Sequence, residues 1–322
     1  MEPKHQQASA RLRQLQEHLT KNVFVGKDDI IDLMVICTVA REPLLLVGPP
    51  GTAKSDLVVA FCQGLGLRSQ NEGDSASTRD YFEYLLTPYT EPNEIFGPVD
   101  LKELQEKGHF TRRREGMLQQ AHMAFLDEIF KANSAILNAL LTLLNERRYY
   151  EAGRYYHSPL ITLFGATNRV PTSAELDALY DRFTLRIQCK NVPDEQQMLM
   201  VQRACSLEGQ KSKGEEYLKP MAGLQDVRAL NQALLESFTP GALAKLEFLP
   251  KFFDKIRAVR LDKVCRINDR KMIKLLKLIF ARALLAGREP MREDMMLLQY
   301  TWDDPENEYL QDKLQQTAYR HL

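Results

Sequence analysis

The stretch from Leu44 to Ser55, which reads LLLVGPPGTAKS, constrains the fold more than any other feature of the sequence. Four apolar residues run into a glycine-rich turn, and Lys54 and Ser55 then open a segment with a helical pattern. This order is typical of a buried strand that turns through a phosphate-binding loop into the N-terminus of a helix. Backbone N–H groups and the helix dipole favour anions at that point. The stretch therefore predicts an α/β fold with a nucleotide site at one strand end.

The loop departs at one position from the general pattern G-x-x-x-x-G-K-[ST], because Ala53 stands where a glycine is usual before the lysine. Alanine tolerates helical dihedral angles well, so we expect Ala53 to be already entering the helix. We expect Lys54 to place its charge near the outermost phosphates and Ser55 to offer its hydroxyl to Mg²⁺. The loop residues expected to contact ATP are Gly48, Pro49, Pro50, Gly51, Thr52, Ala53, Lys54, Ser55 and Asp56.

Composition places the chain among ordinary globular proteins. It has 322 residues, of which 44% are hydrophobic and 27% charged, which is enough for roughly two domains. Lys plus Arg (43) equals Asp plus Glu (43), so no overall field draws it to nucleic acid or to an anionic membrane. The five cysteines have no C-x-x-C spacing, the six histidines have no ligand spacing, and no apolar run approaches the ~20 residues of a membrane span. We expect a cytoplasmic protein with reduced thiols, no structural metal and no membrane insertion.

Two further apolar runs end in polar residues. Residues 121–126 lead into Asp127 and Glu128, and a second run from Leu160 ends at Asn168. The carboxyl ends of parallel strands meet at one edge of a sheet, where ligands of such folds bind, so we expect these side chains near the loop. Asp127 is expected to hold Mg²⁺, Glu128 to polarise the attacking water and Asn168 to orient that water.

The pattern divides the chain at Pro193 into a sheet-based part, residues 1–192, and a helical remainder, residues 193–322, with a polar linker at 211–219. An inserted hairpin is expected at 101–120, and a second hairpin at 148–158 turns at Ala152-Gly153. A long helix is expected at 269–286 and a last helix at 293–302, followed by a polar tail. Strands are expected at 44–47, 81–86, 121–128, 160–168 and 184–189.

Five motifs occur in an order that resembles one family. They read GPPGTAKS, AFLDEIFKAN, ILNALLTLLNER, GATN and LYDRF. Together they resemble the MoxR family of AAA+ ATPases, and ALYDR and NDRK are similar to its RavA (regulatory ATPase variant) subgroup. The resemblance runs from about Val23 to Trp302, and Ala53 fits the family's own Ala-Lys-Ser form. It implies a P-loop AAA+ core of three layers, α/β/α, with a parallel sheet, and a small all-α lid domain.

The resemblance also implies roles for particular residues. Arg182 matches the arginine finger that the family donates to a neighbour's nucleotide, and Arg270 matches the second sensor, which contacts nucleotide. Residues 101–120 resemble the helix-2 insert of the clade, and residues 148–158 resemble its pre-sensor hairpin. The remaining carried-over residues are Lys54 and Ser55 for phosphate and Mg²⁺, Asp127 and Glu128 as the acidic motif, and Asn168 as the first sensor.

The same resemblance implies an assembly. It predicts a homo-oligomer, a hexamer with ATP and Mg²⁺ at subunit interfaces, which remodels a protein client together with a von Willebrand factor A domain protein. RavA-like proteins carry a further partner-binding domain after the AAA+ module, so we expect this chain to be a truncation or a shorter relative. The chain has Arg41-Glu42-Pro43 where the family often has a small polar segment, which leaves the adenine contacts open.

Several residues allow a second interpretation. Arg182 could form an ordinary surface ion pair, with Arg147 then serving as the finger, and Arg270 could point to solvent. The apolar Val23 to Gly26 could pack in the core or place Val25 beside the adenine ring. The Lys271, Lys274 and Lys277 series could mark a membrane-surface helix, although a lid helix with one solvated side fits it better.

Two alternative functions also remain open. Arg112-Arg113-Arg114 and the arginine-tyrosine hairpin at 148–158 interleave basic and aromatic residues as nucleic-acid platforms do, which would suit an AAA+ nucleic-acid motor. Zero net charge and the absence of a dedicated DNA-binding motif weigh against that motor. A scaffold that binds ATP without hydrolysing it ranks last, because every residue that hydrolysis requires is present.

Overall fold

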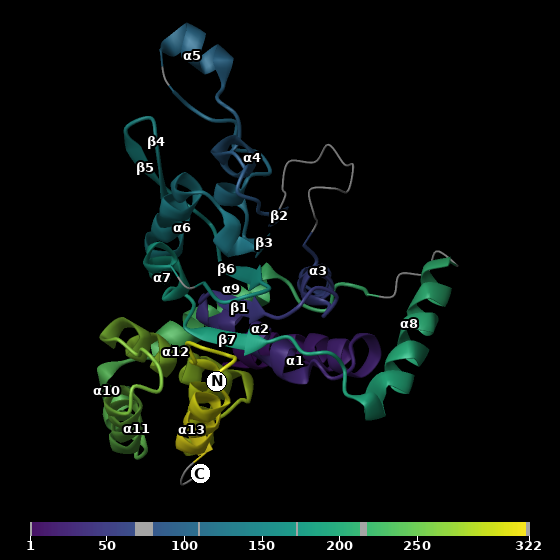
Figure 1. Ribbon diagram of the computed structural model, residues 1–322, viewed down its shortest axis with the longest axis vertical. Coiled ribbons are helices and arrows are strands. Elements are labelled where there is room, and N and C mark those ends of the chain that lie inside the picture. Colours follow the sequence, from purple (N-terminus) through teal and green to yellow (C-terminus); the bar gives the residue numbers. More distant parts are fainter. Residues whose placement is uncertain (1, 68–79, 109, 172, 213–217, 320–322) are drawn as a thin grey trace.

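The computed structural model describes residues 2–67, 80–108, 110–171, 173–212 and 218–319. Its centre is a five-stranded sheet in the order β2-β3-β6-β1-β7, in which every neighbouring pair is parallel (Figure 1). The strands are β1 (Leu44–Val47), β2 (Tyr81–Leu85), β3 (Met123–Asp127), β6 (Thr162–Thr167) and β7 (Leu185–Gln188). The predicted α/β class and the predicted parallel sheet are therefore confirmed, and all five carboxyl ends lie at one edge.

Helices cover both sides of this sheet, with α3 on one side and α6 and α7 on the other (Figure 1). Helix α2 is buried on nearly every side, as a helix must be when it is covered on both faces. It packs on β1 with one face and on α9 and α12 with the other. The helices of this part are α1 (Pro3–His18), α2 (Asp28–Ala40), α3 (Lys54–Gly64), α6 (Ser134–Glu146) and α7 (Ala174–Tyr180), with a π-helical turn at Leu19–Val23 and a 3-10 turn at Ile129–Lys131.

The insert at 101–120 differs from the expected hairpin. It contains the short helix α5 (Leu101–Lys107), and its described strand pairing is a single antiparallel bridge from Arg112 to Val99. The short helix α4 (Pro92–Phe96) precedes the insert. Asp100 caps α5 by accepting from the backbone N–H of Lys102 at 3.0 Å, which explains why a helix forms here. A 3-10 turn at Leu118–Gln120 then leads into β3.

The second hairpin is confirmed. Strands β4 (Arg148–Glu151) and β5 (Arg154–His157) pair antiparallel, and their two-residue turn, Ala152-Gly153, has positive φ at both positions. This is the turn geometry that suits the right-handed twist of a two-stranded ribbon. Figure 1 shows the hairpin projecting from the body beside the segment that carries α4 and α5.

The described residues after β7 form helices and no strand. The expected last helix is a 3-10 segment, Arg292–Tyr300, and the expected polar tail is instead the amphipathic helix α13, which buries Leu314 and Ala318. The tail prediction was wrong because polar residues dominate the segment while its apolar residues keep helical spacing. The other elements are a 3-10 turn at Asp194–Gln196, α8 (Gln197–Ser212), α9 (Leu224–Ser237), α10 (Pro240–Ala244), α11 (Leu249–Leu261), α12 (Asp269–Leu285) and α13 (Glu308–Tyr319).

The lysine series on α12 faces protein rather than solvent or membrane. Lys271 is 2% exposed and lies 3.3 Å from an Asp181 carboxylate oxygen. Lys274 and Lys277 lie 2.7 and 3.3 Å from the carboxylate of Glu42 at the end of α2. The lysines therefore join α12 to the sheet-based part and do not mark a membrane-surface helix. The helix does have a solvated side, as expected of a lid helix, but that side carries Arg270 and Ile273 instead of the lysines. One continuous hydrophobic core runs through both parts, and the domain boundary at 192 stays a prediction.

Candidate functional site

A cavity of about 290 Å³ lies at the carboxyl edge of the sheet, where β1, β3 and β6 end. The phosphate loop lines one wall and the residues that follow β3 and β6 line another. The structure therefore brings together loop and acidic residues that are about seventy positions or more apart in the chain. The lining residues are Pro50, Gly51, Ala53, Lys54, Ser55, Asp56, Leu85, Asp127, Glu128 and Asn168.

Backbone geometry explains the two loop glycines and corrects the expectation for Ala53. A Cβ built on Gly48 would lie 2.3 Å from the carbonyl oxygen of Cys189, so no larger residue fits between the loop and the end of β7. Gly51 has φ +81°, which favours glycine. Ala53 also lies in the left-handed region, at φ 64°, and is not yet helical, contrary to the prediction. An alanine held in this region is strained, and such strain is stored at functional sites.

A chain of hydrogen bonds joins Lys54, Asn168 and Glu128. The Lys54 ammonium, 7% exposed, donates to the carbonyls of Gly48 at 2.7 Å and Pro49 at 3.0 Å, and its Nζ lies 3.3 Å from Asn168 Oδ1. Asn168 in turn donates from Nδ2 to Glu128 Oε1. The amide at the end of β6 is thus held between a cation and a carboxylate, and both its polar atoms are oriented.

Asp127 and Ser55 provide the oxygen atoms that a Mg²⁺ ion prefers. Both line the cavity, and Asp127 Oδ1 accepts from the backbone N–H of Glu128 at 2.9 Å, which fixes the carboxylate. A hydroxyl and a carboxylate suit Mg²⁺, which takes a few protein ligands and keeps the rest of its shell for water and phosphate. The donor set therefore fits the expected ion.

Glu128 has a backbone feature that the sequence did not indicate. Its φ is 51°, in the left-handed region, and it begins a 3-10 turn at Ile129–Lys131. This turn takes the chain sharply away from β3 and leaves the Glu128 side chain at the cavity, where Lys131 Nζ lies 3.4 Å from it. A positive φ at a non-glycine acid beside the loop is a further sign of a functional site.

Arg182 and Arg270 do not line the phosphate-loop cavity in the part of the chain that is described. Burial lowers the pKa of Arg182, and the positive charge of Arg270 lowers it further. The two arginines are therefore close enough to repel each other. Arg182 Nε is buried without a hydrogen-bond partner, and Arg270 Nη1 donates to Asn145 Oδ1 at the end of α6 at 3.4 Å. The Asp181 carboxylate partly offsets this positive charge, and it also lies 3.3 Å from Lys271 Nζ and accepts a hydrogen bond from Asn268 at 2.7 Å.

Arg147, the alternative finger, is held inside the protein. Its Nη2 donates to the carbonyls of Arg41 at 2.6 Å and Ile161 at 3.2 Å. These bonds tie the end of α6 to the residues that precede β1 and β6. Arg147 therefore has a structural position, and Arg182 remains the better candidate.

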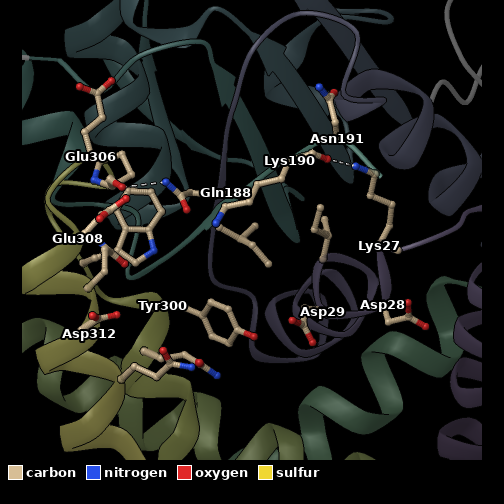
Figure 2. A pocket seen from close by; sticks show the side chains of 18 of the residues that line it. Lys27, Asp28, Asp29, Gln188, Lys190, Asn191, Tyr300, Glu306, Glu308 and Asp312 are labelled. Atoms are coloured by element: carbon tan, nitrogen blue, oxygen red, sulfur yellow. Dashed lines mark hydrogen bonds between the residues drawn. The ribbon is translucent and has the colours of Figure 1, made fainter. Parts of the chain in front are cut away.

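A larger cavity, of about 930 Å³, lies between the start of α2, the end of β7 and α13. Figure 2 shows Lys27, Lys190 and Tyr300 around it, and the dashed line from Lys27 marks its bond to the Lys190 carbonyl at 2.5 Å. Gly26 lines this cavity, whereas Val25 is only 7% exposed. No phosphate-loop residue lines it, so size alone does not identify the site, and an adenine contact of Val25 stays a prediction.

Three of the arginines expected in a nucleic-acid platform, Arg112, Arg113 and Arg114, are engaged by the protein itself, whereas Arg148 and Arg154 of the hairpin are exposed. Arg112 Nη1 donates to Asn93 Oδ1 at 2.6 Å, and Arg113 lies 3.6 Å from Asp100. Arg114 lies 2.7 Å from the Glu151 carboxylate and stacks over the Tyr156 ring at 4.4 Å. These contacts give the arginines a role in joining the insert to the hairpin.

The sheet order and the residues gathered at its carboxyl edge place this protein among the AAA+ ATPases. Residues 10–232 match the family described as the MoxR domain in the MoxR-vWA-beta-propeller ternary systems. The chain belongs to this MoxR family, as the sequence motifs predicted. Membership of the RavA subgroup stays a prediction.

Relatives and solved structures agree with the assignment. An uncharacterized protein of Methanocaldococcus jannaschii is 33% identical over 301 residues, which cover 92% of this chain and 73% of that protein. The chaperone MoxR1 of Mycobacterium tuberculosis is 26% identical over 172 residues, 52% of this chain and 41% of its own length. A crystal structure of a candidate ATPase from Cytophaga hutchinsonii has the same fold, with a TM-score of 0.69 at 17% identity and coverage of 100% of this chain and 97% of that one. Among the residues described, no helix is both long enough and apolar enough to span a bilayer.

Proposed function

We propose that this protein hydrolyses ATP with Mg²⁺ and that a homo-oligomer, a hexamer by family resemblance, is the active form. The observation that carries the proposal is the hydrogen-bonded chain from Lys54 through Asn168 to Glu128 beside the phosphate loop. It supplies a cation for phosphate, an amide to position water and a carboxylate to accept a proton, all at one cavity.

The roles follow from the contacts. Lys54 and the loop N–H groups bind the phosphates, and Asp127 and Ser55 hold the Mg²⁺, which when bound neutralises charge on the phosphate oxygens. Asn168 orients a water molecule and Glu128 polarises it by accepting its proton, while Lys131 at 3.4 Å keeps the carboxylate in place.

Arg182 and Arg270 are proposed to act on the nucleotide of a neighbouring copy. Phosphoryl transfer builds negative charge that a guanidinium stabilises. The cavity of their own chain lacks them, and their shared position, with Arg182 Nε unpaired, supports an anion supplied from outside the chain. Contact between different surfaces of successive copies is head-to-tail, and such contacts form a ring when the rotation between copies closes.

The work done by hydrolysis is proposed to be remodelling of a protein client. The family description names von Willebrand factor A domain and β-propeller proteins in ternary systems, which supports a partner of the von Willebrand factor A type. The name of the chaperone MoxR1 is in keeping with this. The contacts that Arg112, Arg113 and Arg114 make within the protein do not favour the nucleic-acid motor.

The test is the steady-state ATPase rate per chain as a function of protein concentration. We expect the rate to rise with concentration, Glu128→Gln to lower kcat by about 10³-fold, and Arg182→Ala to lower it at every concentration. Lys263→Ala, an exposed cation near Arg270 in sequence, serves as the matched control. A rate that is independent of concentration and unaffected by both substitutions would reject the proposal, and strong stimulation by DNA would favour the nucleic-acid motor.

A further inference from the structure

Helix α8 (Gln197–Ser212) stands away from the rest of the molecule. Figure 1 shows it projecting beyond α3, on the side of the sheet opposite α7, α10 and α11. Its described contacts are chiefly with the π-helical turn Leu19–Val23 and the 3-10 turn before it. Arg203 anchors it by donating to the Thr20 carbonyl at 2.7 Å and to the Phe24 carbonyl.

Four consecutive large apolar residues of α8 are exposed. Successive residues of a helix point about 100° apart, so these side chains cover most of its circumference. The described residues of the same chain leave all four exposed. Contiguous exposed apolar residues of this kind mark interaction sites. The exposed fractions are 69% for Met198, 42% for Leu199, 40% for Met200 and 51% for Val201.

The opposite side of the molecule carries two exposed apolar side chains, Ile273 and Leu261, near Arg270. Ile273, 55% exposed, follows Arg270 by three positions on α12, so both lie on one helix face. Leu261, 73% exposed, ends α11, and the ion pair of Arg260 with Asp269 at 2.8 Å holds that end beside the start of α12. Any contact that brings Arg270 to another copy therefore also brings Ile273 and Leu261 close to it.

We propose that α8 of one copy docks on Ile273 and Leu261 of the next copy. The occupant is a second copy because donor and acceptor surfaces lie on opposite sides of one chain, as a head-to-tail contact requires. The inference rests on the proposed function, since the same contact carries Arg182 and Arg270 to the neighbour's phosphate loop. The helix thus acts as an arm that holds adjacent subunits in register for catalysis.

The first test measures assembly in the presence of ATP by analytical ultracentrifugation. Leu199→Glu places a charge in the apolar interface and should raise the concentration at the midpoint of assembly at least about tenfold. Gln14→Glu, which adds the same charge at an exposed polar position of α1, away from α8, should leave that midpoint unchanged. Because both positions are exposed, both variants should keep the wild-type thermal unfolding temperature. Assembly of Leu199→Glu at the wild-type concentration would overturn the docking.

The second test uses Cys205, an exposed thiol on the same face of α8 as Met198 and Val201. In the Ile273→Cys variant, a short bis-maleimide should link Cys205 of one copy to the introduced thiol of the next copy. The products should form a ladder of covalent oligomers. Neither the Cys205→Ser/Ile273→Cys protein nor Gln14→Cys, with its thiol on exposed α1, should form that ladder. If the protein assembles and loses activity on Arg182→Ala and yet forms no ladder, that result rejects the docking of α8 but keeps the proposed function. A chain that stays monomeric with ATP at every concentration rejects both.

Discussion

The carboxyl edge of the sheet and the start of α12 are both rich in charged residues, yet they differ in completeness. At the sheet edge Lys54, Asn168 and Glu128 are hydrogen-bonded to one another within a single chain. At the start of α12, Arg182 and Arg270 repel each other, and the nearby Asp181 carboxylate is shared with Lys271 and Asn268. The first region is therefore hydrogen-bonded within one chain, whereas the second holds two arginines and a lysine around one carboxylate. In the proposed mechanism, nucleotide binding belongs to one copy and turnover to the assembly.

Mixing two inactive proteins tests whether the arginines of one copy act on the phosphate loop of another. One is Lys54→Ala, which keeps its arginines, and the other is Arg182→Ala/Arg270→Ala, which keeps its phosphate loop. Each alone should lose about 10³-fold in kcat, because a finger arginine is worth about that much. Mixed oligomers should recover a measurable part of the ATPase rate, since intact arginines then face intact loops.

The control for this experiment is a mixture of Lys54→Ala with Glu128→Gln, in which no copy has a complete sheet-edge site. It should stay inactive. If the first mixture also shows no recovery although both proteins assemble together, the arginines act within their own chain, and the contrast between the two regions disappears.

A smaller effect is expected for binding itself. Lys54→Ala should weaken binding of a fluorescent ATP analogue about 100-fold, or about 2.7 kcal/mol, because the buried ammonium is the charged partner of the phosphates. Arg270→Ala should leave the Kd of the monomer unchanged. The measurement is a titration at a protein concentration below assembly.

Lys27→Ala provides the matched control, because this lysine lines the larger cavity and is likewise buried. Its Kd for the analogue should equal that of the wild type. Equal weakening by Lys27→Ala would mean that the larger cavity also receives the nucleotide, and the two regions would no longer be separate.

Arg186 tests how firmly the two regions are joined. Its side chain is fully buried, with Nη1 2.7 Å from Asp303 Oδ1 and Nη2 3.2 Å from the Tyr180 carbonyl. Arg186→Leu leaves these acceptors unpaired and should lower the free energy of unfolding by about 2 kcal/mol in urea titrations. Arg257→Leu, which breaks the exposed pair with Asp254, should change it by less than about 0.5 kcal/mol. Similar losses for both would show that Arg186 does not join β7 to the residues after Tyr300.

The sheet and the residues at its carboxyl edge could be predicted because each of these strands has a clear sequence pattern. Apolar runs that end at Asp127 and Asn168 mark buried strands, and parallel strands must end at one edge. The sequence alone therefore predicts that Asp127, Asn168 and Lys54 lie close together. The roles of these residues in catalysis stay predictions.

Three features could not be predicted from the sequence: the backbone of Ala53, the helix that begins at Leu101 and the position of Arg270. Ala53 adopts left-handed dihedrals because the loop requires them, which overrides the intrinsic preference of alanine. The segment around Leu101 is too short for its periodicity to separate a helix from a hairpin. The position of Arg270 depends on the path that the chain takes after β7, and no local pattern encodes that path.

The smallest expected effect concerns the thiols, which report on the two regions without changing either. Burial raises the pKa of Cys189 and Cys265 to about 11, so at pH 8 their reactive thiolate is more than about 100-fold scarcer than that of an ordinary cysteine. Cys205 is exposed, and a thiol reagent should therefore label one of five cysteines rapidly in the native protein and all five in denaturant. Above the assembly midpoint the labelling of Cys205 should slow several-fold, while the buried thiols stay unreactive. Rapid labelling of Cys189, which lies against Gly48, would show that the sheet edge opens in solution and that a single chain does not hold its binding site ready.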